Sequence, residues 1–341
     1  MLIDRPDRDG SLFLKNNPAL RTALLSSGPV GLIFSGPTEL CDHPRDNLND
    51  HIIGVVAALG SAASWALGTI LFKGVGAEFS SMAMTFIKST AGALLLFLTL
   101  FFVGWTTPQS DALGWLALSG LLGISAGDTF FFAALQRLGA HQLIIIMMLG
   151  PAVTVLMAVL VLGELPSLLA WVGIILVLGG VSLTLFGDSR GEEQSATTQT
   201  GIVFGLLCIV SMAISIIVAK LGLRNVSAIE GTFLRMAFGF CGMLLLGLFR
   251  RKIGSWLHPL RKGGLRGRFA LAVVVVTFGG FWLSLAAVKH LDVSIANTLI
   301  ATEPLFALPL AVVWLRERPS RLAVTGACLA FPGALLLTLN A

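Results

Sequence analysis

Four ionisable residues lie inside long apolar stretches of the chain: Lys88, Asp128, Arg235 and Glu303. Insertion scales put the cost of a charge at the centre of a membrane-spanning helix at roughly 2.5 to 3.5 kcal/mol, so such residues usually face a cavity or a charged partner. A buried cation can hold an anionic group, and a buried carboxyl can carry a proton. These four residues are therefore candidates for binding a solute or for coupling to protons.

Glu303 stands immediately before Pro304. Proline lacks the backbone N–H and its ring clashes with the preceding turn, so we expect the helix to loosen and bend one turn earlier. Burial disfavours the charged form of a carboxyl, which suits a proton carrier. Glu303 could therefore couple transport to protons, or it could simply hydrogen bond to a neighbouring helix. Asp128, directly after Gly127, could serve in the same way.

Further polar and aromatic candidates share these apolar stretches. Asn297 and Thr302 lie shortly before the carboxyl described above, where they could line a binding site or hydrogen bond between helices. Trp65 and Trp282 lie away from the segment ends, so they could stack on a solute or pack in the core. Ser211 could expose its hydroxyl to a solute or serve as a small residue that lets two helices approach.

The segments that hold these residues are typical of membrane spans. The chain is 55% hydrophobic and 12% charged, whereas soluble domains are about 25% charged. Apolar stretches of about 18 residues or more are long enough to cross a bilayer. Charges and Gly/Pro/Ser clusters divide the sequence into ten such segments, at about 52–72, 81–103, 112–135, 143–162, 168–186, 201–221, 228–248, 269–288, 293–315 and 322–339.

The sequence contains an internal duplication. At an offset of 147 residues Lys88 aligns with Arg235. At an offset of 153 residues three features align in the same order. A proline within the fourth segment, Pro151, aligns with Pro304 of the ninth. The glutamate and the Pro-Ser pair that follow also align, Glu164 with Glu317 and Pro166-Ser167 with Pro319-Ser320. Shared apolar composition does not produce such a series by chance. We therefore predict two homologous repeats of five segments each.

An odd number of spans in each repeat means that the second repeat enters the membrane from the opposite side. The predicted fold is thus an all-α integral membrane protein with ten transmembrane helices in two inverted five-helix repeats, an arrangement typical of secondary transporters. Inversion would place Lys88 and Arg235 near opposite faces. There they could flank a central cavity, extend their charges to the membrane surface with their stems in lipid, or form structural ion pairs.

The predicted organisation follows from these repeats. Residues 1–50 are expected to be a disordered tail, 51–187 the first five-helix repeat, 188–200 a linker and 201–341 the second repeat. The sequence leaves open whether the tail belongs to the natural protein. Lys and Arg concentrate in the loops after odd-numbered spans, which favours external termini.

Several classes of function are disfavoured. A net charge of +5 could suggest nucleic acid, but most Lys and Arg lie in loops between spans, so we expect no nucleic-acid partner. The four cysteines and five histidines show no metal-ligand spacing, and no Gly-rich phosphate loop of the Walker kind is present. We therefore expect no metal and no cofactor. An intramembrane enzyme would need a catalytic set such as Ser/His or paired Asp within facing spans, and because the sequence offers none we expect no enzymatic activity.

The chain resembles the EamA-type branch of the drug/metabolite transporter superfamily from about residue 52 to 339. The residues that carry the resemblance are Pro151 followed by Gly163-Glu164-Leu165-Pro166, and Glu303-Pro304 followed by Arg316-Glu317-Arg318-Pro319. The acidic residue that often precedes the first proline in that family is Gly150 here, so only the second repeat keeps it. The motif residues Pro151, Glu164, Pro304 and Glu317 are interpreted as structural, each glutamate lying beside the N-terminus of the next helix.

The resemblance implies a secondary-active transporter, expected to be an exporter, that moves small metabolites, amino acids or drugs by alternating access, with proton coupling as an option. The expected partners are a small-molecule substrate and the lipid bilayer, with a homo-oligomer left open. The expected location is the plasma membrane of a bacterium. Family members generally keep both termini in the cytoplasm, against the charge count above, so orientation stays open. The alternative is a membrane scaffold or receptor that transports nothing.

Overall fold

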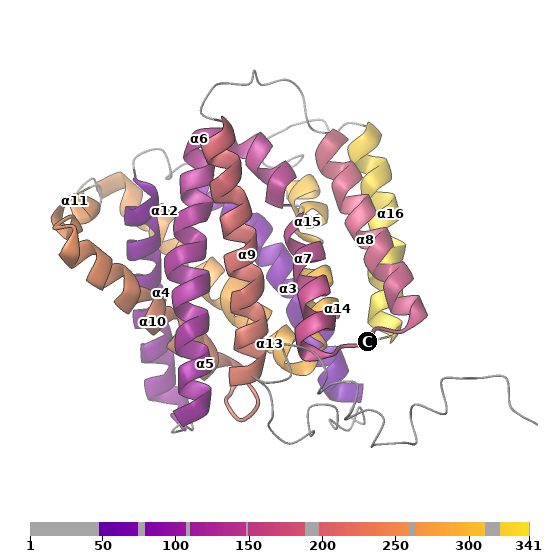
Figure 1. The fold of residues 1–341 in the computed structure, drawn as a ribbon, viewed down its shortest axis with the longest axis horizontal. Coiled ribbons are helices and arrows are strands. Elements are labelled where there is room, and N and C mark those ends of the chain that lie inside the picture. The colour runs from indigo at the N-terminus through magenta and orange to yellow at the C-terminus, as the bar shows by residue number, and fades with distance from the viewer. Residues whose placement is uncertain are drawn as a thin grey trace, which may run out of the picture. The chain divides into compact units, whose positions relative to one another are not determined.

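The computed structural model describes residues 48–73, 79–106, 110–147, 149–187, 198–258, 263–310 and 321–340. Within these ranges the chain is helical and contains no strand (Figure 1). The first half comprises α3 (Leu48–Lys73), α4 (Ser81–Val103), α5 (Ser110–Gly120), η2 (Leu121–Gly127), α6 (Asp128–Met147), α7 (Leu149–Met157), η3 (Ala158–Leu162) and α8 (Leu168–Gly187). The second half comprises α9 (Thr198–Gly222), α10 (Ala228–Phe249), α11 (Ile253–Leu257), α12 (Gly263–Val274), η5 (Val275–Trp282), α13 (Leu283–His290), α14 (Val293–Ile300), α15 (Glu303–Leu310) and α16 (Arg321–Asn340).

Six helical stretches in the described part of the chain are long and apolar enough to cross a membrane: Asn49–Gly68, Ser81–Val103, Ser110–Leu138, Gln199–Gly222, Ala228–Phe249 and Phe269–His290. Four shorter apolar helices accompany them, at Leu149–Leu162, Leu168–Leu183, Val293–Ala307 and Val324–Leu339. Each stretch overlaps one segment predicted from the sequence. The all-helical membrane character of the chain is thus confirmed.

One predicted boundary is wrong. The sequence suggested a break between the third and fourth segments near Gly139, but α6 continues as a helix to Met147. A glycine inside a helix costs only about 1 kcal/mol, and no proline stops the helix there. At the aligned place in the second half, Leu291 and Asp292 separate α13 from α14.

The predicted distortion before Pro304 is confirmed. α14 ends at Ile300, a turn occupies Ala301 and Thr302, and a new helix, α15, starts at Glu303. Proline cannot donate a hydrogen bond to the preceding turn, and its ring displaces that turn. The polar stretch around Glu303 therefore coincides with a break in a helix.

Two π-helical segments lie at corresponding places in the two halves. η2 covers Leu121–Gly127 and leads directly into Asp128, and η5 covers Val275–Trp282. An offset of 153 residues superimposes most of one segment on the other. π-Segments are often found at functional sites because they widen the helix and reorient the side chains beside them. The sequence analysis did not predict them.

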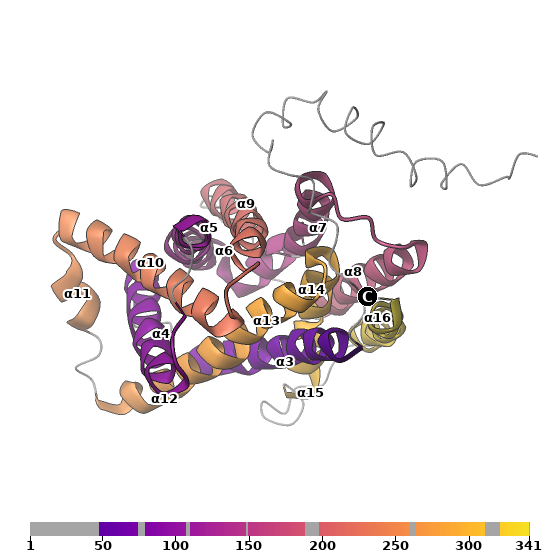
Figure 2. The same cartoon turned by 90° about the horizontal axis from the view of Figure 1, so that it is seen from below.

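Helices α8 and α16 pack side by side through glycines (Figures 1 and 2). A Cβ atom added to Gly173 would lie 3.0 Å from the carbonyl oxygen of Gly333, and one added to Gly180 would lie 2.6 Å from that of Gly326. Gly173 aligns with Gly326, and Gly180 with Gly333, at the offset of 153. Each of these two close contacts is therefore the repeat counterpart of the other.

A second reciprocal pair joins the halves elsewhere. A Cβ atom on Gly54 of α3 would lie 2.6 Å from Leu291 Cγ, and one on Gly201 of α9 would lie 2.6 Å from Leu138 Cγ. Gly54 aligns with Gly201 at the offset of 147, and Leu138 with Leu291 at the offset of 153. α3 of the first half thus packs against Leu291, at the end of α13, in the same way as α9 of the second half packs against Leu138 of α6.

Candidate functional site

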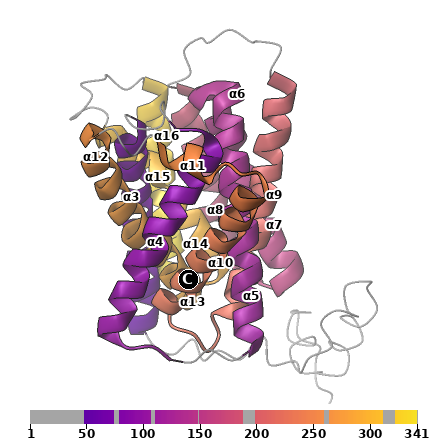
Figure 3. The same ribbon diagram turned by 90° about the vertical axis from the view of Figure 1, so that its left-hand side faces the viewer.

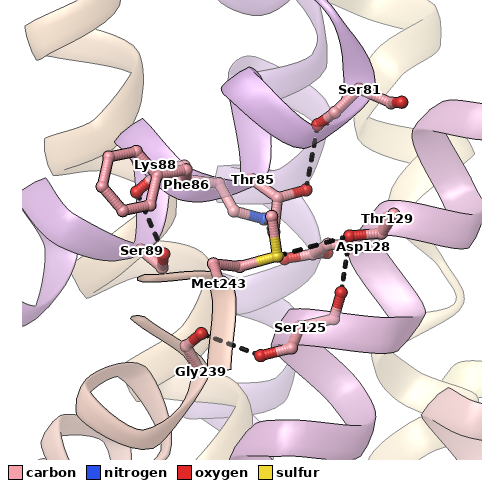
Figure 4. A network of polar contacts seen from close by, with 10 residues as sticks. All are labelled: Ser81, Thr85, Phe86, Lys88, Ser89, Ser125, Asp128, Thr129, Gly239 and Met243. Atoms are coloured by element: carbon pink, nitrogen blue, oxygen red, sulfur yellow. Dashed lines mark hydrogen bonds and ion pairs between the residues drawn. The ribbon is translucent and has the colours of Figure 1, made fainter. Parts of the chain in front are cut away.

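A buried ion pair links α4 to α6. Lys88 Nζ lies 2.6 Å from Asp128 Oδ2 and donates a hydrogen bond to it (Figure 4). The side chains are only 5% and 7% exposed. Lys88 lies on the buried face of α4, and Asp128 is the first residue after the π-segment η2. The structure thus joins two of the four charged residues that the sequence singled out.

Aromatic rings surround the ammonium group of Lys88. Its Nζ lies 4.9 Å from the ring centroid of Phe281 and 5.9 Å from that of Phe132. Trp65, a predicted site residue, packs edge-on against Phe281 with centroids 4.9 Å apart. Ring faces attract cations when water is excluded. Trp65 therefore belongs to the surroundings of the ion pair, one ring removed from Lys88.

Arg235 lies on α10, which packs against α4 and against α5 and η2 (Figure 3). It is 7% exposed, and its Nη2 donates a hydrogen bond to Ser215 Oγ at 3.0 Å. Its Nε has no hydrogen-bond partner. The guanidinium also interacts electrostatically with Asp128. A third charged candidate therefore lies within electrostatic range of the buried ion pair.

Glycines of α5 and η2 provide the space for this arginine. A Cβ atom on Gly120 would lie 2.3 Å from the carbonyl oxygen of Arg235, and one on Gly123 would lie 2.3 Å from Ser215 Oγ and 3.3 Å from Arg235 Nη2. Ser119 Oγ also donates to the backbone carbonyl oxygen of Ser215 at 2.6 Å, and Ser215 Oγ donates to that of Ser119 at 2.7 Å. Small residues thus let α9, α10 and η2 approach closely around the guanidinium.

Further hydrogen bonds attach η2 and α6 to α10 next to the ion pair (Figure 4). Ser125 Oγ donates to the carbonyl oxygen of Gly239 at 2.8 Å, and Thr129 Oγ1 lies 3.6 Å from Met243 Sδ. These contacts flank Asp128 on both sides along the chain. They hold its backbone against α10 and so fix where the carboxylate points.

The burial of the two cations decides one alternative left open by the sequence. A lysine or arginine that extends to the membrane surface keeps its charged end exposed, but Lys88 and Arg235 are 4% and 7% exposed. The structure therefore contradicts that interpretation. Two of the three interpretations of these cations remain: that they line a solute site, and that they form structural ion pairs. Lys88 forms an ion pair in this structure.

The other predicted site residues lie elsewhere in the bundle. Asn297, Thr302 and Glu303 lie on and between α14 and α15, which pack against α3. The buried Thr302 hydroxyl donates to the carbonyl oxygen of Leu299 at 2.6 Å, so it is engaged within its own segment. Trp282 is half-buried and packs edge-on against Phe278. Ser211 is half-buried on α9.

Glu164 lies at a helix N-terminus, as predicted, but that helix is α14 of the other half of the chain and not the next helix. Its carboxylate accepts hydrogen bonds from Val293 N at 2.6 Å, Ser294 N at 2.9 Å and Ser294 Oγ at 2.7 Å, at the N-terminus of α14. The sequence had placed it beside the N-terminus of α8, but there Ser167 Oγ accepts from Ala170 N. The prediction was misled because Glu164 lies only four residues before the first residue of α8.

Burial raises the pKa of Glu164, and the hydrogen bonds from Ser294 offset this only in part. The motif residue Pro151 lies in the first turn of α7, where its missing N–H needs no partner. Glu317 lies outside the described residues.

Lys220 is a residue that the sequence analysis did not single out. Its Nζ donates to the carbonyl oxygens of Val288 at 2.6 Å and Leu291 at 2.8 Å, at the C-terminal end of α13. Cations are favourable at helix C-termini because carbonyls there lack intrahelical partners. The sequence could have shown that Lys220 lies in the last turn of a helix. It could not have shown its partner, because Val288 lies 68 residues away. Together with Glu164, Lys220 connects span ends that are distant in sequence.

Within the described ranges, no group of three or more His, Cys, Asp or Glu side chains is arranged to hold a metal ion.

The profile of the EamA-like transporter family matches the chain twice, over residues 52–186 and 199–339. The chain belongs to the EamA-like transporter family. The double match shows that this EamA-like protein contains an internal repeat, and the membership makes it an integral membrane protein of a transporter family.

Relatives carry the same description. The chain is 30% identical to the uncharacterized transporter YvbV of Bacillus subtilis (strain 168) over 152 residues, which cover 42% of this chain and about half, 48%, of YvbV. It is 26% identical to an uncharacterized transporter of Archaeoglobus fulgidus over 84% of this chain and 99% of that protein. A crystal structure with 21% sequence identity superimposes with a TM-score of 0.65 and covers 86% of this chain, which shows the same fold.

Proposed function

We propose that this EamA-like protein is a secondary-active transporter that moves a small solute by alternating access, with the solute held at the Lys88–Asp128–Arg235 cluster. The observation that carries the proposal is this buried cluster, on helices of both repeats, in a chain of a transporter family. Charges inside membrane spans are costly and are typically found where a substrate, ion or proton binds.

Alternating access needs two halves that can rock against each other. We propose ten spans, with residues 51–187 and 201–341 as two inverted five-helix repeats. The proposal is supported by the two family matches, by the reciprocal glycine contacts, and by the corresponding π-segments η2 and η5. Five spans in each repeat reverse the second relative to the first, as in many transporters that bind substrate at the repeat interface.

The charged cluster combines residues of both repeats, as a substrate site at a repeat interface would. Lys88 and Asp128 belong to the first repeat, and Arg235 to the second. A solute that contacts both repeats would feel their relative movement, so binding could favour one arrangement over the other. Outward transport of metabolites, amino acids or drugs across a bacterial plasma membrane is part of the proposal, and rests on the family resemblance.

Proton coupling forms part of the same proposal. Glu303 lies at the break between α14 and α15, and α14 packs against α3, the first helix of the other repeat. A carboxyl at a helix break can exchange a proton when the halves move. Glu303→Gln should weaken the pH dependence of flux while leaving flux itself measurable, and an unchanged pH dependence would remove Glu303 from the mechanism.

The test is flux through lipid vesicles that contain the purified protein. A mixed panel of metabolites, amino acids and drugs is followed with and without an imposed pH gradient. We expect at least one panel member to move faster than in protein-free vesicles, with a rate that follows the gradient. If folded protein accelerates no panel member in either direction, the transporter proposal fails and a scaffold becomes the better explanation.

A further inference from the structure

The buried cluster contains more positive than negative charge. Lys88 and Arg235 are cations, and Asp128 is the carboxylate that the described part of the chain places against both. Asp128 Oδ2 is engaged by Lys88 at 2.6 Å. The guanidinium of Arg235 donates to a neutral hydroxyl, Ser215 Oγ, and its Nε has no partner. A buried charge is stable when it is paired and hydrogen bonded, and among the described residues this cluster has one cation more than it has carboxylates.

The internal repeat shows which of the two cations has a carboxylate at the corresponding position. Lys88 aligns with Arg235 at the offset of 147, but Asp128 aligns with Phe281 at the offset of 153. The first repeat therefore supplies a cation with its carboxylate, whereas the second supplies a cation and an aromatic ring. That ring lies 4.9 Å from Lys88 Nζ. Arg235 is thus the cation whose counter-ion the chain does not provide from the corresponding position.

We propose that the cluster binds the anionic group of a small solute between Lys88 and Arg235, and that Asp128 is an exchangeable counter-ion that gives up Lys88 when it takes a proton. The solute class is a small monoanion with a carboxylate or phosphate group, next to the aromatic surface of Phe281 and Trp65. This inference rests on the proposed transport function and names the substrate class of the same site.

The geometry suits such an exchange. When Asp128 takes a proton, the bound anion replaces it as the counter-ion of Lys88, whose ammonium also lies over the rings of Phe281 and Phe132. Arg235 offers a planar array of donors that matches carboxylates and phosphates, and its Nε is unpartnered. Neither cation would have to leave the interior to receive the anion.

Proton and anion should therefore bind together. The groups that act on Asp128 are Lys88 on α4, Arg235 on α10 and Cys208 on α9, of which the first two are cations. Protonation of Asp128 removes the negative charge that competes with the solute, and a bound anion in turn favours protonation, because such coupling is reciprocal. The linkage predicts tighter anion binding at lower pH.

The test measures binding through thermal stabilisation, since a ligand that binds only the folded state raises its stability. Purified protein in detergent is titrated with benzoate, benzamide and benzylamine, which share a ring and differ in charge, and with methyl phosphate. We expect benzoate or methyl phosphate to stabilise the protein at concentrations at least about tenfold lower than benzamide, with benzylamine without effect. The apparent affinity for benzoate, which stays a monoanion over this range, should increase from pH 8 to pH 6.

Variants separate the roles of the three charged groups. Arg235→Gln should weaken anion binding by about tenfold or more, the loss expected for one charge-assisted hydrogen bond. Asp128→Asn should make anion binding independent of pH. The matched control is Arg137→Gln, because Arg137 is an exposed arginine on the same helix as Asp128; this variant should bind as the wild type does.

The inference and the proposed function fail in different ways. If vesicles show flux but the wild type binds the amide or the amine as tightly as the anion, the anion site is wrong and transport stands. Anion binding that is stronger at high pH would overturn the role of Asp128. Absence of flux from folded protein overturns the proposed function instead. The binding and pH measurements on the wild type are sufficient to support or overturn the anion site, even if one of the variants does not fold.

Discussion

Replacing the Lys88–Asp128 pair tests whether it is a buried ion pair. Removing one partner leaves an uncompensated buried charge, which costs about 3 to 5 kcal/mol, whereas replacing both with apolar residues is often neutral or stabilising. With side chains 5% and 7% exposed, the pair belongs to that class. Lys88→Met and Asp128→Val should each lower the free energy of unfolding by about 3 to 5 kcal/mol. The double variant should lower it by no more than either single variant, because it leaves no unpaired Lys88 but still removes the carboxylate that acts on Arg235.

The assay is equilibrium unfolding in mixed detergent micelles, followed by circular dichroism, for the wild type and the three variants. The coupling energy from this cycle should be at least about 3 kcal/mol, because the costs of the two single changes do not add in the double variant. Exposed ion pairs give only about 0.2 to 1 kcal/mol. Single changes that cost less than about 1 kcal/mol and add together would show that water reaches the pair, and would refute this reasoning.

Three further predictions concern packing and capping. Gly120→Ala should destabilise the protein by about 1 to 3 kcal/mol, because the added Cβ atom would lie 2.3 Å from a backbone oxygen of α10. Gly114→Ala on the same helix should not, because no atom lies within 4 Å of the added Cβ atom. Thermal unfolding of the two variants measures the difference. Gly180→Ala should likewise separate α8 from α16, but Gly179→Ala should leave stability unchanged, and crosslinking across the two helices would detect the difference. Burial raises the pKa of Glu164 above 4.5, so its contribution is present below that pH and is lost as pH rises through the raised value. The stability of the wild type relative to Glu164→Gln should therefore fall over that window, and a difference that is constant or rises with pH would contradict the burial argument.

The sequence predicted the helices better than it predicted their contacts. The bounds 81–103 agree with α4, because a serine cap and a glycine mark its ends. The repeat identified Lys88 and Arg235 as counterparts, since alignment needs no knowledge of packing. The ion pair joins residues 40 positions apart, and whether a cation turns toward lipid or toward a neighbour depends on the rotation of its helix. Apolar stretches on all sides of a helix do not specify that rotation.

Glu164 illustrates the same limit. Its partners lie 129 and 130 residues away, in the other half of the chain, and no local pattern points to them. The π-segments were also missed, because their glycines resemble those of ordinary helix packing. The break before Glu303 was predicted correctly because proline acts locally on the preceding turn.

The central claim is that the charged cluster holds the transported solute. The most direct measurement is exchange of labelled benzoate across vesicles containing either the wild type or the double variant Lys88→Met/Asp128→Val, with the folded state of each protein verified by circular dichroism. The wild type should accelerate exchange above protein-free vesicles, and the double variant should do so at least about tenfold less at low solute concentration. Equal exchange rates for the two folded proteins would contradict the claim.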